Sequence, residues 1–351
     1  MSDVGMLRLY SQRITDTAFK DAGQVVAWLG AMQGQDYAGT KWAFGLRLGE
    51  VTDRDIEQAL TDGIILRTWA LRGTLHYVAP ADIHWLLALI APRQIAGNAR
   101  RYKQLELDDV TLTRSTRLIA DALHEASLLT RSELFAILTA NGISTAGQRG
   151  VYMLQRAALE RLVYQGPVRR NETTFRALAP GTVLPKDHAL AELARRYFMS
   201  HGPTTLNDFT AWSGLLISEA RTGLEAVRSE LAEEKIDDQT YFLSPEKPKA
   251  LDPSVYLLPG FDEFVLGYRD RSAVLEAQFA DAICPGGNGM FTPTLVSEGR
   301  IIGTWKRTIK SKIVEIAFTL FRPLSVGEEV EVQAAAARFG TFLGLSAKLI
   351  F

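Results

Sequence analysis

The residues with the clearest chemical potential are two glutamines, Gln33 and Gln35, which flank a single glycine in AMQGQDYAG and precede Asp36 directly. A carboxamide is a poor acid and a poor base, but its oxygen accepts a hydrogen bond from water and its NH₂ group donates to a ligand. Two such groups can hold a water molecule and stabilise a developing cation without a strong base. The pair is therefore a candidate catalytic site.

Convergence of the two side chains depends on the local backbone. Residues i and i+2 point about 200° apart in a helix but lie on the same side of an extended segment. The apolar spacing predicts a helix over 24–33, so convergent glutamines require this helix to end near Gly34, a residue type common at helix ends. The alternative is a solvated helix end. Asp36 is either a candidate for water activation or a cap of the following turn.

Motifs for several other chemistries are missing from the sequence. It contains no Gly-rich phosphate loop with its lysine and no HExxH motif. The single cysteine, Cys284, excludes an internal disulfide and a cysteine zinc cluster, and CPGGNGMF (284–291) is interpreted as a turn. The five histidines lack ligand spacing, and His76 is interpreted as structural or as a DNA contact. We expect no metal and no cofactor.

The composition is that of a folded globular protein, with 351 residues, 47% hydrophobic and 23% charged. No apolar run approaches the roughly 20 residues needed to cross a bilayer. The beginning of the chain, MSDVGMLRLYSQ, lacks the basic, apolar and small-residue order of a secretory signal. We therefore expect a cytoplasmic protein without a membrane partner.

Basic residues cluster although the formal net charge is only −1. RQIAGNARRYK (93–103) and TWKRTIKSK (304–312) each contain four basic residues and no acid. Residues 145–170 contain five basic residues against Glu160 alone. Each cluster by itself is equally well explained as a solvated face, but the three together favour a polyanionic partner.

The clearest structural pattern lies in residues 131–178. Apolar residues at helical spacing predict a helix within 131–143 that ends in an NGI turn, and a second over 144–162, with Ser144 or Thr145 as the candidate cap. Two extended pieces, LVYQG and TTFRAL, follow. Helix, turn, helix and hairpin make a winged helix, in which the second helix enters the major groove and the hairpin touches the flanking backbone.

The same order recurs on either side of this segment. Its elements within 187–243 are helices over 187–202, 204–214 and 216–231 and a wing strand over 235–243. Its elements within 1–85 are helices over 24–33 and 53–61 and wing strands over 65–71 and 73–79. Thr204 or Thr205 is the expected cap of the middle helix in 187–243, and Gly214 is the expected turn after it.

From Val255 onwards the sequence alternates apolar and polar residues between glycine turns, which is strand periodicity, and a short helix is predicted near 326–338. The expected boundary is SPEKPKALDPS (244–254). We therefore predict an α+β fold of tandem winged-helix (helix-turn-helix) domains followed by a C-terminal β-barrel-like domain. The predicted domains are residues 1–110, 111–182 and 183–245 for the three winged helices and 253–351 for the β-rich domain.

Five blocks of the chain carry a resemblance to a known family. They are LRLYSQRI, VVAWLGAMQGQDYAG, ILRTWALRGTLHYVAPADIHWLL, LLPGFDEFVLGYRDRSAVL and GMFTPTLVSEGRIIGTWKR. In the same order, and over nearly the whole chain, they look like the corresponding blocks of the winged-helix DNA glycosylases of the AlkZ/YcaQ type. The agreement of several separated blocks makes the resemblance specific.

The resemblance implies three tandem winged helices and a C-terminal β-barrel that together bind duplex DNA, and removal of alkylated purines, including bulky or crosslinked adducts. The family signature is a glutamine, one usually apolar residue, then a glutamine or related polar residue. It maps onto Gln33 and Gln35, with Gly34 in place of the larger apolar residue. Because an N-alkylated purine is cationic and leaves as a neutral base, the glutamines would need only to position water and stabilise an oxocarbenium-like sugar.

Basic residues near these blocks are candidate DNA contacts. On the first predicted wing they are Arg67 and Arg72. The alternative for these two is an ion pair with Asp62 or Asp82. In the predicted second winged helix the candidates are Arg149, Arg156, Arg169 and Arg170.

The predicted hairpin near the C-terminus adds three further candidates. Lys306 and Arg307, with Trp305 beside them, suit contact with the minor groove or the backbone. The alternative for Trp305 is a place in the barrel core. The alternating charges and aromatic residues of FDEF and YRDRS favour a structural network over chemistry.

Three functions are consistent with these features. The first is a monofunctional DNA glycosylase, a nucleoid-associated monomer that acts on duplex DNA through Gln33 and Gln35. The second is a non-enzymatic winged-helix DNA-binding protein or transcription regulator, although no dimerisation helix is evident. The third is a lineage that kept the fold and binds something else.

Overall fold

The computed structural model describes residues 4–236, 239–246, 248 and 254–350. Much of the predicted boundary segment 244–254 lies outside the described residues. The helices are α1 (Val4–Ser11), α2 (Ala22–Leu29), α3 (Tyr37–Leu48), α4 (Asp53–Thr61), α5 (Ile83–Gly97), α6 (Ala99–Gln104), α7 (Asp109–Ala126), α8 (Arg131–Ala140), α9 (Arg149–Leu159), α10 (Lys186–His201), α11 (Leu206–Ser213), α12 (Ile217–Val227), α13 (Glu263–Leu266), α14 (Ala280–Ile283) and α15 (Val326–Leu343).

The strands form three sheets. The first has the order β1-β3-β2-β5-β6-β4, from β1 (Met32–Gln33), β3 (Leu75–Val78), β2 (Leu66–Trp69), β5 (Val163–Arg169), β6 (Glu172–Ala177) and β4 (Leu129–Thr130). The second has the order β13-β12-β11-β10-β9, from β13 (Ser346–Ile350), β12 (Ile313–Leu320), β11 (Arg300–Ile309), β10 (Thr294–Ser297) and β9 (Val255–Leu258). The third pairs β7 (Ala232–Ile236) with β8 (Gln239–Leu243).

The first sheet joins two segments that are distant in the sequence. The hairpin β2–β3 and the hairpin β5–β6 meet where Arg67 of β2 pairs with Gln165 of β5. On its other side, β3 pairs with the two-residue strand β1, so that Gln33 lies opposite His76. The hairpin predicted as the first wing is therefore flanked by protein on both edges.

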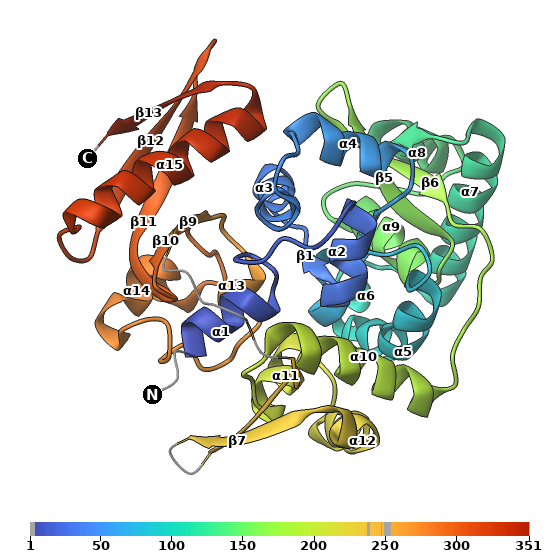
Figure 1. Cartoon of the computed structure of the whole chain (residues 1–351). Helices are drawn as coiled ribbons and strands as arrows, with labels where there is room; N and C mark the ends of the chain where they lie inside the picture. Colours follow the sequence, from blue (N-terminus) through green and yellow to red (C-terminus); the bar gives the residue numbers. More distant parts are fainter. Residues whose placement is uncertain (1–3, 237–238, 247, 249–253, 351) are drawn as a thin grey trace.

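The C-terminal unit is an open sheet with a long helix against it. Its strands are antiparallel except that β12 and β13 run parallel, and its edge strands β13 and β9 are not paired with each other. Helix α15 begins with a capping box of Ser325 and Glu328 and ends at Gly344, whose φ of 68° is in the left-handed region. The predicted β-rich C-terminal end is thus confirmed in the form of an open, curled sheet (Figure 1).

The two ends of the chain share one hydrophobic core. Side chains of α2, α3 and α4 pack with those of β9–β12 and α15. Trp42 of α3 donates its indole N–H to the carbonyl of Leu257 at 2.6 Å and packs against Phe339 and Phe342 of α15. The loop between β1 and α3 is consequently held between the first sheet and the C-terminal unit.

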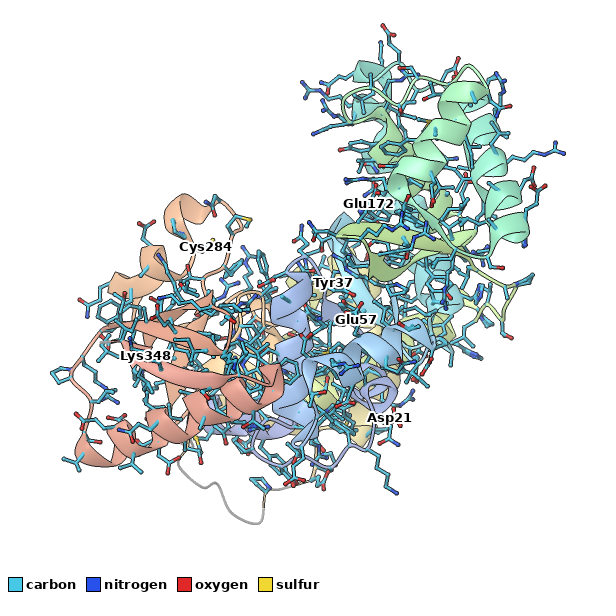
Figure 2. The ribbon with its side chains drawn as sticks, turned by 90° about the horizontal axis from the view of Figure 1, so that it is seen from above. Asp21, Tyr37, Glu57, Glu172, Cys284 and Lys348 are labelled. Carbon is cyan, nitrogen blue, oxygen red and sulfur yellow. The ribbon has the colours of Figure 1, made fainter. Side chains whose placement is uncertain are left out.

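The second and third clusters of buried residues lie away from this core. One joins α5 and the β2–β3 hairpin with α10, α11 and α12, and the other joins α7, α8 and α9 with β5 and β6. In Figure 2 the α7–α9 unit stands apart from the C-terminal sheet, with α3 and α4 between them.

Several predicted elements are confirmed, and others need correction. Helix α4 has the predicted bounds, Thr205 caps α11 in a capping box with Asp208, and Gly214 ends α11 in the left-handed conformation. Helix α9 begins at Arg149, so the predicted start and caps at 144–145 are wrong. The single wing strand predicted over 235–243 is wrong, because this segment contains the end of β7 and the whole of β8. Residues 237–238 between them lie outside the described residues.

Candidate active site

The two glutamines converge on an extended loop. Helix α2 ends at Leu29, with Gly30 as its cap at a φ of 79°, so the chain leaves the helix earlier than the predicted end near Gly34. Gln33 lies in β1 and Gln35 follows in the loop before α3. The Nε2 of Gln33 donates to the Oε1 of Gln35 at 2.8 Å. Gln33 is 6% exposed whereas Gln35 is exposed, so the inner amide supports the outer one.

Neighbouring groups fix Gln33 at three further points. Its amide oxygen accepts from the hydroxyl of Thr74 at 3.1 Å, and its carbonyl accepts from the hydroxyl of Thr40 at 2.8 Å. Its backbone N–H donates to the Oε1 of Glu263 at 2.9 Å. Side chain and main chain of Gln33 are both held, which gives Gln35 a rigid support.

The glycine between the glutamines is explained by its surroundings. The backbone N–H of Gly34 donates to the carbonyl of Leu75 at 2.7 Å. A Cβ at this position would lie 3.1 Å from two ring atoms of Tyr77, which is fully buried. The Tyr77 ring therefore fills the space that the larger apolar residue of the family signature would need.

Arg67 holds the same loop and is buried, contrary to its predicted place at the surface. Its Nε and Nη2 donate to the carbonyl of Gly34 at 2.9 and 2.7 Å, and its Nη1 donates to Gln165 at 2.5 Å. The side chain is 6% exposed because β2 lies in the interior of the first sheet. Its prediction as a phosphate contact is wrong. The alternative ion pairs with Asp62 and Asp82 are also absent among the described residues.

Asp36 is the cap of α3. Its carboxylate accepts from the backbone N–H of Gly39 at 2.9 Å, which confirms the alternative interpretation of this residue. The Nη2 of Arg307, from β11, lies 3.9 Å from the same carboxylate. The hairpin β11–β12 therefore reaches the loop that carries the glutamines. Beyond the cap, the hydroxyl of Tyr37 donates to Glu57 of α4 at 2.7 Å (Figure 2).

A buried carboxylate lies behind Gln33. Glu263, the first residue of α13, is 2% exposed, and its Oε2 accepts from the indole N–H of Trp212 at 2.9 Å and lies 3.5 Å from the Nε2 of His201. Burial would raise the pKa of this carboxyl, but the adjacent His201 ring and the hydrogen bond from the backbone N–H of Gln33 lower the pKa of Glu263 to about 2. Glu263 is therefore ionised at neutral pH.

His76 is a structural residue on the strand beside Gln33. It is fully buried, and its Nδ1 donates to the carbonyl of Thr74 at 3.0 Å. Burial, together with the charge of Arg72, lowers the pKa of His76 to about 4, so the ring is neutral at pH 7. The structural interpretation of His76 is confirmed.

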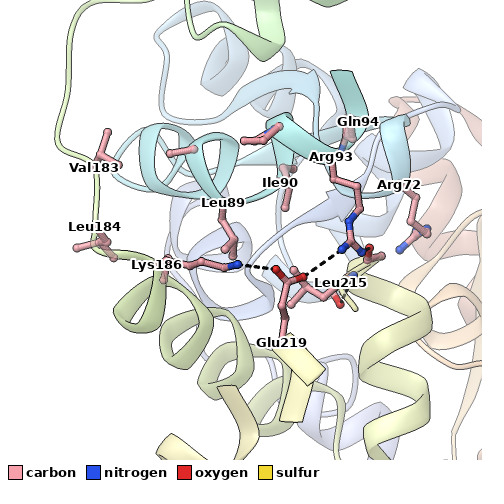
Figure 3. Close-up of a pocket in the computed structure, with 15 residues that line it drawn as sticks. Arg72, Leu89, Ile90, Arg93, Gln94, Val183, Leu184, Lys186, Leu215 and Glu219 are labelled. Atoms are coloured by element: carbon pink, nitrogen blue, oxygen red, sulfur yellow. Dashed lines mark hydrogen bonds and ion pairs between the residues drawn. The ribbon is translucent and has the colours of Figure 1, made fainter. Parts of the chain in front are cut away.

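A separate cavity of about 520 Å³ lies between α5, α10, α11 and α12 (Figure 3). Its wall is largely apolar, and Glu219 within it binds Lys186 at 2.7 Å and Arg93 at 3.5 Å. Arg72 lines one end, whereas Gln33 and Gln35 do not line this cavity. Gln35 thus faces the solvent, with Gln33 buried behind it, at a different place from the cavity.

Comparison with known proteins bears on this geometry. The model of the family described as "DNA glycosylase AlkZ-like" matches residues 26–342. The chain belongs to this family. A curated relative, the interstrand DNA cross-link repair glycosylase of Streptomyces sahachiroi, is 25% identical over 362 residues, which cover 93% of each chain. The solved structure of the Streptomyces sahachiroi DNA glycosylase AlkZ has a TM-score of 0.80 and 22% identity, with 99% of this chain and 98% of that chain covered.

This AlkZ-like protein is thus a DNA glycosylase, an enzyme of DNA repair that binds DNA and hydrolyses N-glycosyl bonds. Membership in the family favours the enzyme over the two non-enzymatic alternatives. None of the described helices has the length and apolar character needed to span a bilayer. Among the same residues, no three His, Cys, Asp or Glu side chains are grouped to hold a metal ion.

The predicted DNA contacts of the C-terminal hairpin divide into two kinds. Trp305 is 1% exposed, packs against Phe339, and donates its indole N–H to the carbonyl of Leu258 at 2.8 Å. It belongs to the core, so its prediction as a DNA contact is wrong. Lys306 is exposed and Arg307 is partly exposed beside Asp36, so contact of these two with DNA stays a prediction.

Three of the four candidates in the α7–β6 segment have partners within the protein. Arg149 donates to the carbonyls of Ser144, Leu105 and Glu106, and Arg156 pairs with Glu160 at 2.5 Å. Arg169 pairs with Glu133, and Arg170 is exposed at the turn of the β5–β6 hairpin. These contacts do not test DNA binding, so it stays a prediction for the four arginines of this segment. It also stays a prediction for Arg72, which is exposed.

Sequence reasoning missed the residues that hold the glutamines. Glu263 and Trp212 lie far from Gln33 in the sequence, and Thr74 lies in the turn just before β3. The one available signal was the FDEF block, where two acids stand among apolar residues. The expectation of a structural network there is confirmed, since Asp262 binds the buried Arg47 at 2.9 and 3.0 Å.

Proposed function

We propose that this glycosylase hydrolyses the N-glycosidic bond of alkylated, cationic purines in duplex DNA, with Gln33 and Gln35 as its catalytic pair. The observation that carries the proposal is the 2.8 Å hydrogen bond from Gln33 Nε2 to Gln35 Oε1, on a loop whose main chain is fixed on both sides. Such a pair offers positioned amide groups and no strong base, which matches a substrate whose base leaves without protonation.

The two glutamines have different tasks in this mechanism. The Thr74 hydroxyl orients the amide of Gln33, and Gln33 in turn orients the amide of Gln35. A carbonyl oxygen accepts two hydrogen bonds, so Gln35 Oε1 can accept a second one from the attacking water. Its NH₂ group, which has no partner among the described residues, is available to the DNA. The Oε1 atom of Gln35 also stabilises the oxocarbenium-like sugar as the neutral base departs.

Asp36 supports this reaction indirectly in our proposal. Its carboxylate is engaged as the α3 cap and faces Arg307, so we assign it the orientation of the loop and of that arginine in place of water activation. Arg307 and Lys306 then lie on a hairpin next to the glutamines, where they can bind phosphates on either side of the lesion.

The remaining DNA contacts follow from the fold. We propose that residues 1–110, 111–182 and 183–245 act as winged helices and that the sheet of 253–351 completes the DNA-binding surface. The order α8, α9, β5 and β6, with β4 paired to β6, supports this for the second of them. Because Gln33 and Gln35 come from one loop, a single copy of the chain suffices.

Bulky adducts also fit the site. The named relative repairs interstrand crosslinks, and we propose that this enzyme accepts large adducts as well. The exposure of Gln35 and its position outside the cavity of Figure 3 support this proposal, because an adduct would not have to enter that cavity.

The experiment that tests the function incubates the enzyme with duplex DNA that carries a single N7-alkylguanine or N3-alkyladenine and measures the free base. We expect release of the base, an abasic product and no covalent adduct on borohydride reduction. Retention of the intact lesion with both substrates would contradict the proposal, and a trapped covalent complex would contradict the direct attack of water.

A further inference from the structure

The strongest unexplained group is the carboxylate of Glu263. It is ionised and nearly fully buried; it accepts from the backbone N–H of Gln33 at 2.9 Å and from the indole N–H of Trp212 at 2.9 Å, and the ring of His201 lies 3.5 Å away. A buried charge is costly unless it is hydrogen-bonded, and an apolar side chain of similar size is often at least as stable. Stability alone therefore does not account for a charge at this position.

The neighbouring residue shows how a purely structural acid behaves here. Asp262 accepts two hydrogen bonds from Arg47 of α3, which is fully buried, and one from the backbone N–H of Phe264. These bonds attach the start of α13 to α3, the helix that begins directly after the glutamine loop. Glu263 thus approaches Gln33 from a frame that is fixed to the same loop.

We propose that Glu263 is a positioning residue for catalysis, whose carboxylate fixes the peptide of Gln33 and through it the side chain of Gln35. This inference rests on the catalytic function proposed for the two glutamines. Glu263 holds the backbone N–H of Gln33, while Thr40 and Thr74 hold its carbonyl and its amide oxygen. Of these three contacts, only the one from Glu263 carries a full charge, and charge-assisted hydrogen bonds are about twice as strong as neutral ones.

The consequence is a chain of contacts that leads from the core to the reacting atoms. Glu263 touches Gln33, Gln33 touches Gln35, and Gln35 is exposed to solvent. Loss of the carboxylate frees the peptide of Gln33 to shift. A misplacement of about 1 Å at a catalytic group costs on the order of a hundredfold in rate. The DNA-binding surface is untouched, so the loss falls on the chemical step.

The test uses Glu263→Gln and Glu263→Asp in single-turnover base release, with binding to undamaged duplex measured in parallel. The first variant keeps the shape and removes the charge; the second keeps the charge and withdraws it by one methylene. We expect both to lower the rate constant by roughly ten- to a hundredfold, with unchanged Kd. A parental rate in either folded variant overturns the proposal.

A matched control is Asp208→Asn. Asp208 is also 2% exposed and accepts backbone N–H donors, from Thr205 at 3.0 Å and from Arg269 at 2.8 Å, but it does not touch Gln33. We expect this variant to lose thermal stability and to keep the parental rate. An equal loss of rate in Asp208→Asn would show a general effect of buried charge and would overturn the role of Glu263.

A double-mutant cycle separates positioning from an independent effect. Gln33→Ala keeps the backbone N–H and removes the side chain through which Glu263 acts, so Glu263→Gln is expected to add no further loss in that background. Fully additive losses overturn the proposal. Parental rates in both Gln33→Ala and Gln35→Ala would contradict the catalytic role of the two glutamines. Slow glutamine variants together with parental rates in the Glu263 variants would contradict only the positioning role of Glu263.

Discussion

Gly34→Ala probes the tight space between the two glutamines. The new Cβ would lie 3.1 Å from the Cδ2 and Cε2 atoms of Tyr77 and 3.5 Å from the Nε of Arg67. The Tyr77 ring cannot retreat easily, because it is fully buried and meets Phe44 edge-on at a centroid distance of 5.5 Å. The loop itself must therefore move by a few tenths of an ångström.

The size of the effect follows from these contacts. Overpacking costs about 1–3 kcal/mol, and the lower entropy of the unfolded chain with alanine returns about 0.4–1 kcal/mol. We expect a net destabilisation of about 1–2 kcal/mol. If a 1 Å misplacement costs about a hundredfold, a shift of a few tenths of an ångström lowers the rate of base release by roughly three- to tenfold.

The assay is single-turnover base release from an alkylated duplex, together with thermal melting. Gly97→Ala is the control, because a Cβ on this exposed glycine of α5 meets nothing within 4 Å. We expect the control to keep the parental rate and to melt at or slightly above the parental temperature, because alanine here brings the entropy gain without a clash. A Gly34→Ala enzyme that is as fast and as stable as the parent would refute the reasoning that Tyr77 and Arg67 fix the loop.

Three further predictions concern the surroundings of the site. Arg67→Met removes two charge-assisted hydrogen bonds to the carbonyl of Gly34, so unfolding becomes easier by a few kcal/mol and base release slows. Lys306→Ala removes an exposed cation, so the slope of log K for DNA against log salt falls by about 0.9 if this residue neutralises one phosphate. The pKa of His76 is lowered from 6.5 to about 4, so between these pH values the unfolded chain binds a proton that the folded protein does not. The free energy of unfolding therefore falls by up to about 3 kcal/mol as the pH drops from 6.5 to 4, and His76→Gln lacks this part of the pH dependence.

Each of these predictions has an outcome that contradicts it. Parental melting and rate in Arg67→Met would show that the loop is held elsewhere. An unchanged salt slope in Lys306→Ala would place this lysine outside the DNA interface. Identical stability profiles of the parent and His76→Gln between pH 6.5 and pH 4 would show that His76 is not kept neutral by its burial.

The parts of the fold that could be predicted from the sequence depend on local signals. The apolar spacing of 53–61 sufficed for α4, and Thr205 and Gly214 marked the ends of α11. The start of α9 was misplaced because Ser144 and Thr145 are good caps by type, while the helix begins at Arg149 without a side-chain cap. Residue type alone does not predict the start of a helix where tertiary contacts fix the preceding turn. Here Arg149 donates to the carbonyls of Ser144 and Glu106 and fixes that turn.

The candidate site was only partly accessible to the same reasoning. The glutamine pair was located by type, spacing and resemblance, and its convergence follows from the extended backbone after Gly30. Arg67 was misjudged because an arginine on a strand looks like a surface cation until the strand is known to lie inside a sheet. Glu263 was not assigned to the pair, since its contact with Gln33 joins residues 230 positions apart.

The measurement that tests the central claim most directly compares the parent with Gln35→Ala in single-turnover release of N7-methylguanine from duplex DNA, with Kd measured for both. Removal of one preorganised catalytic group costs about a hundred- to a thousandfold in comparable sites. We expect the parent to release the base and the variant to be slower by about that factor, with unchanged Kd. Equal rates of base release in the two proteins would contradict the account.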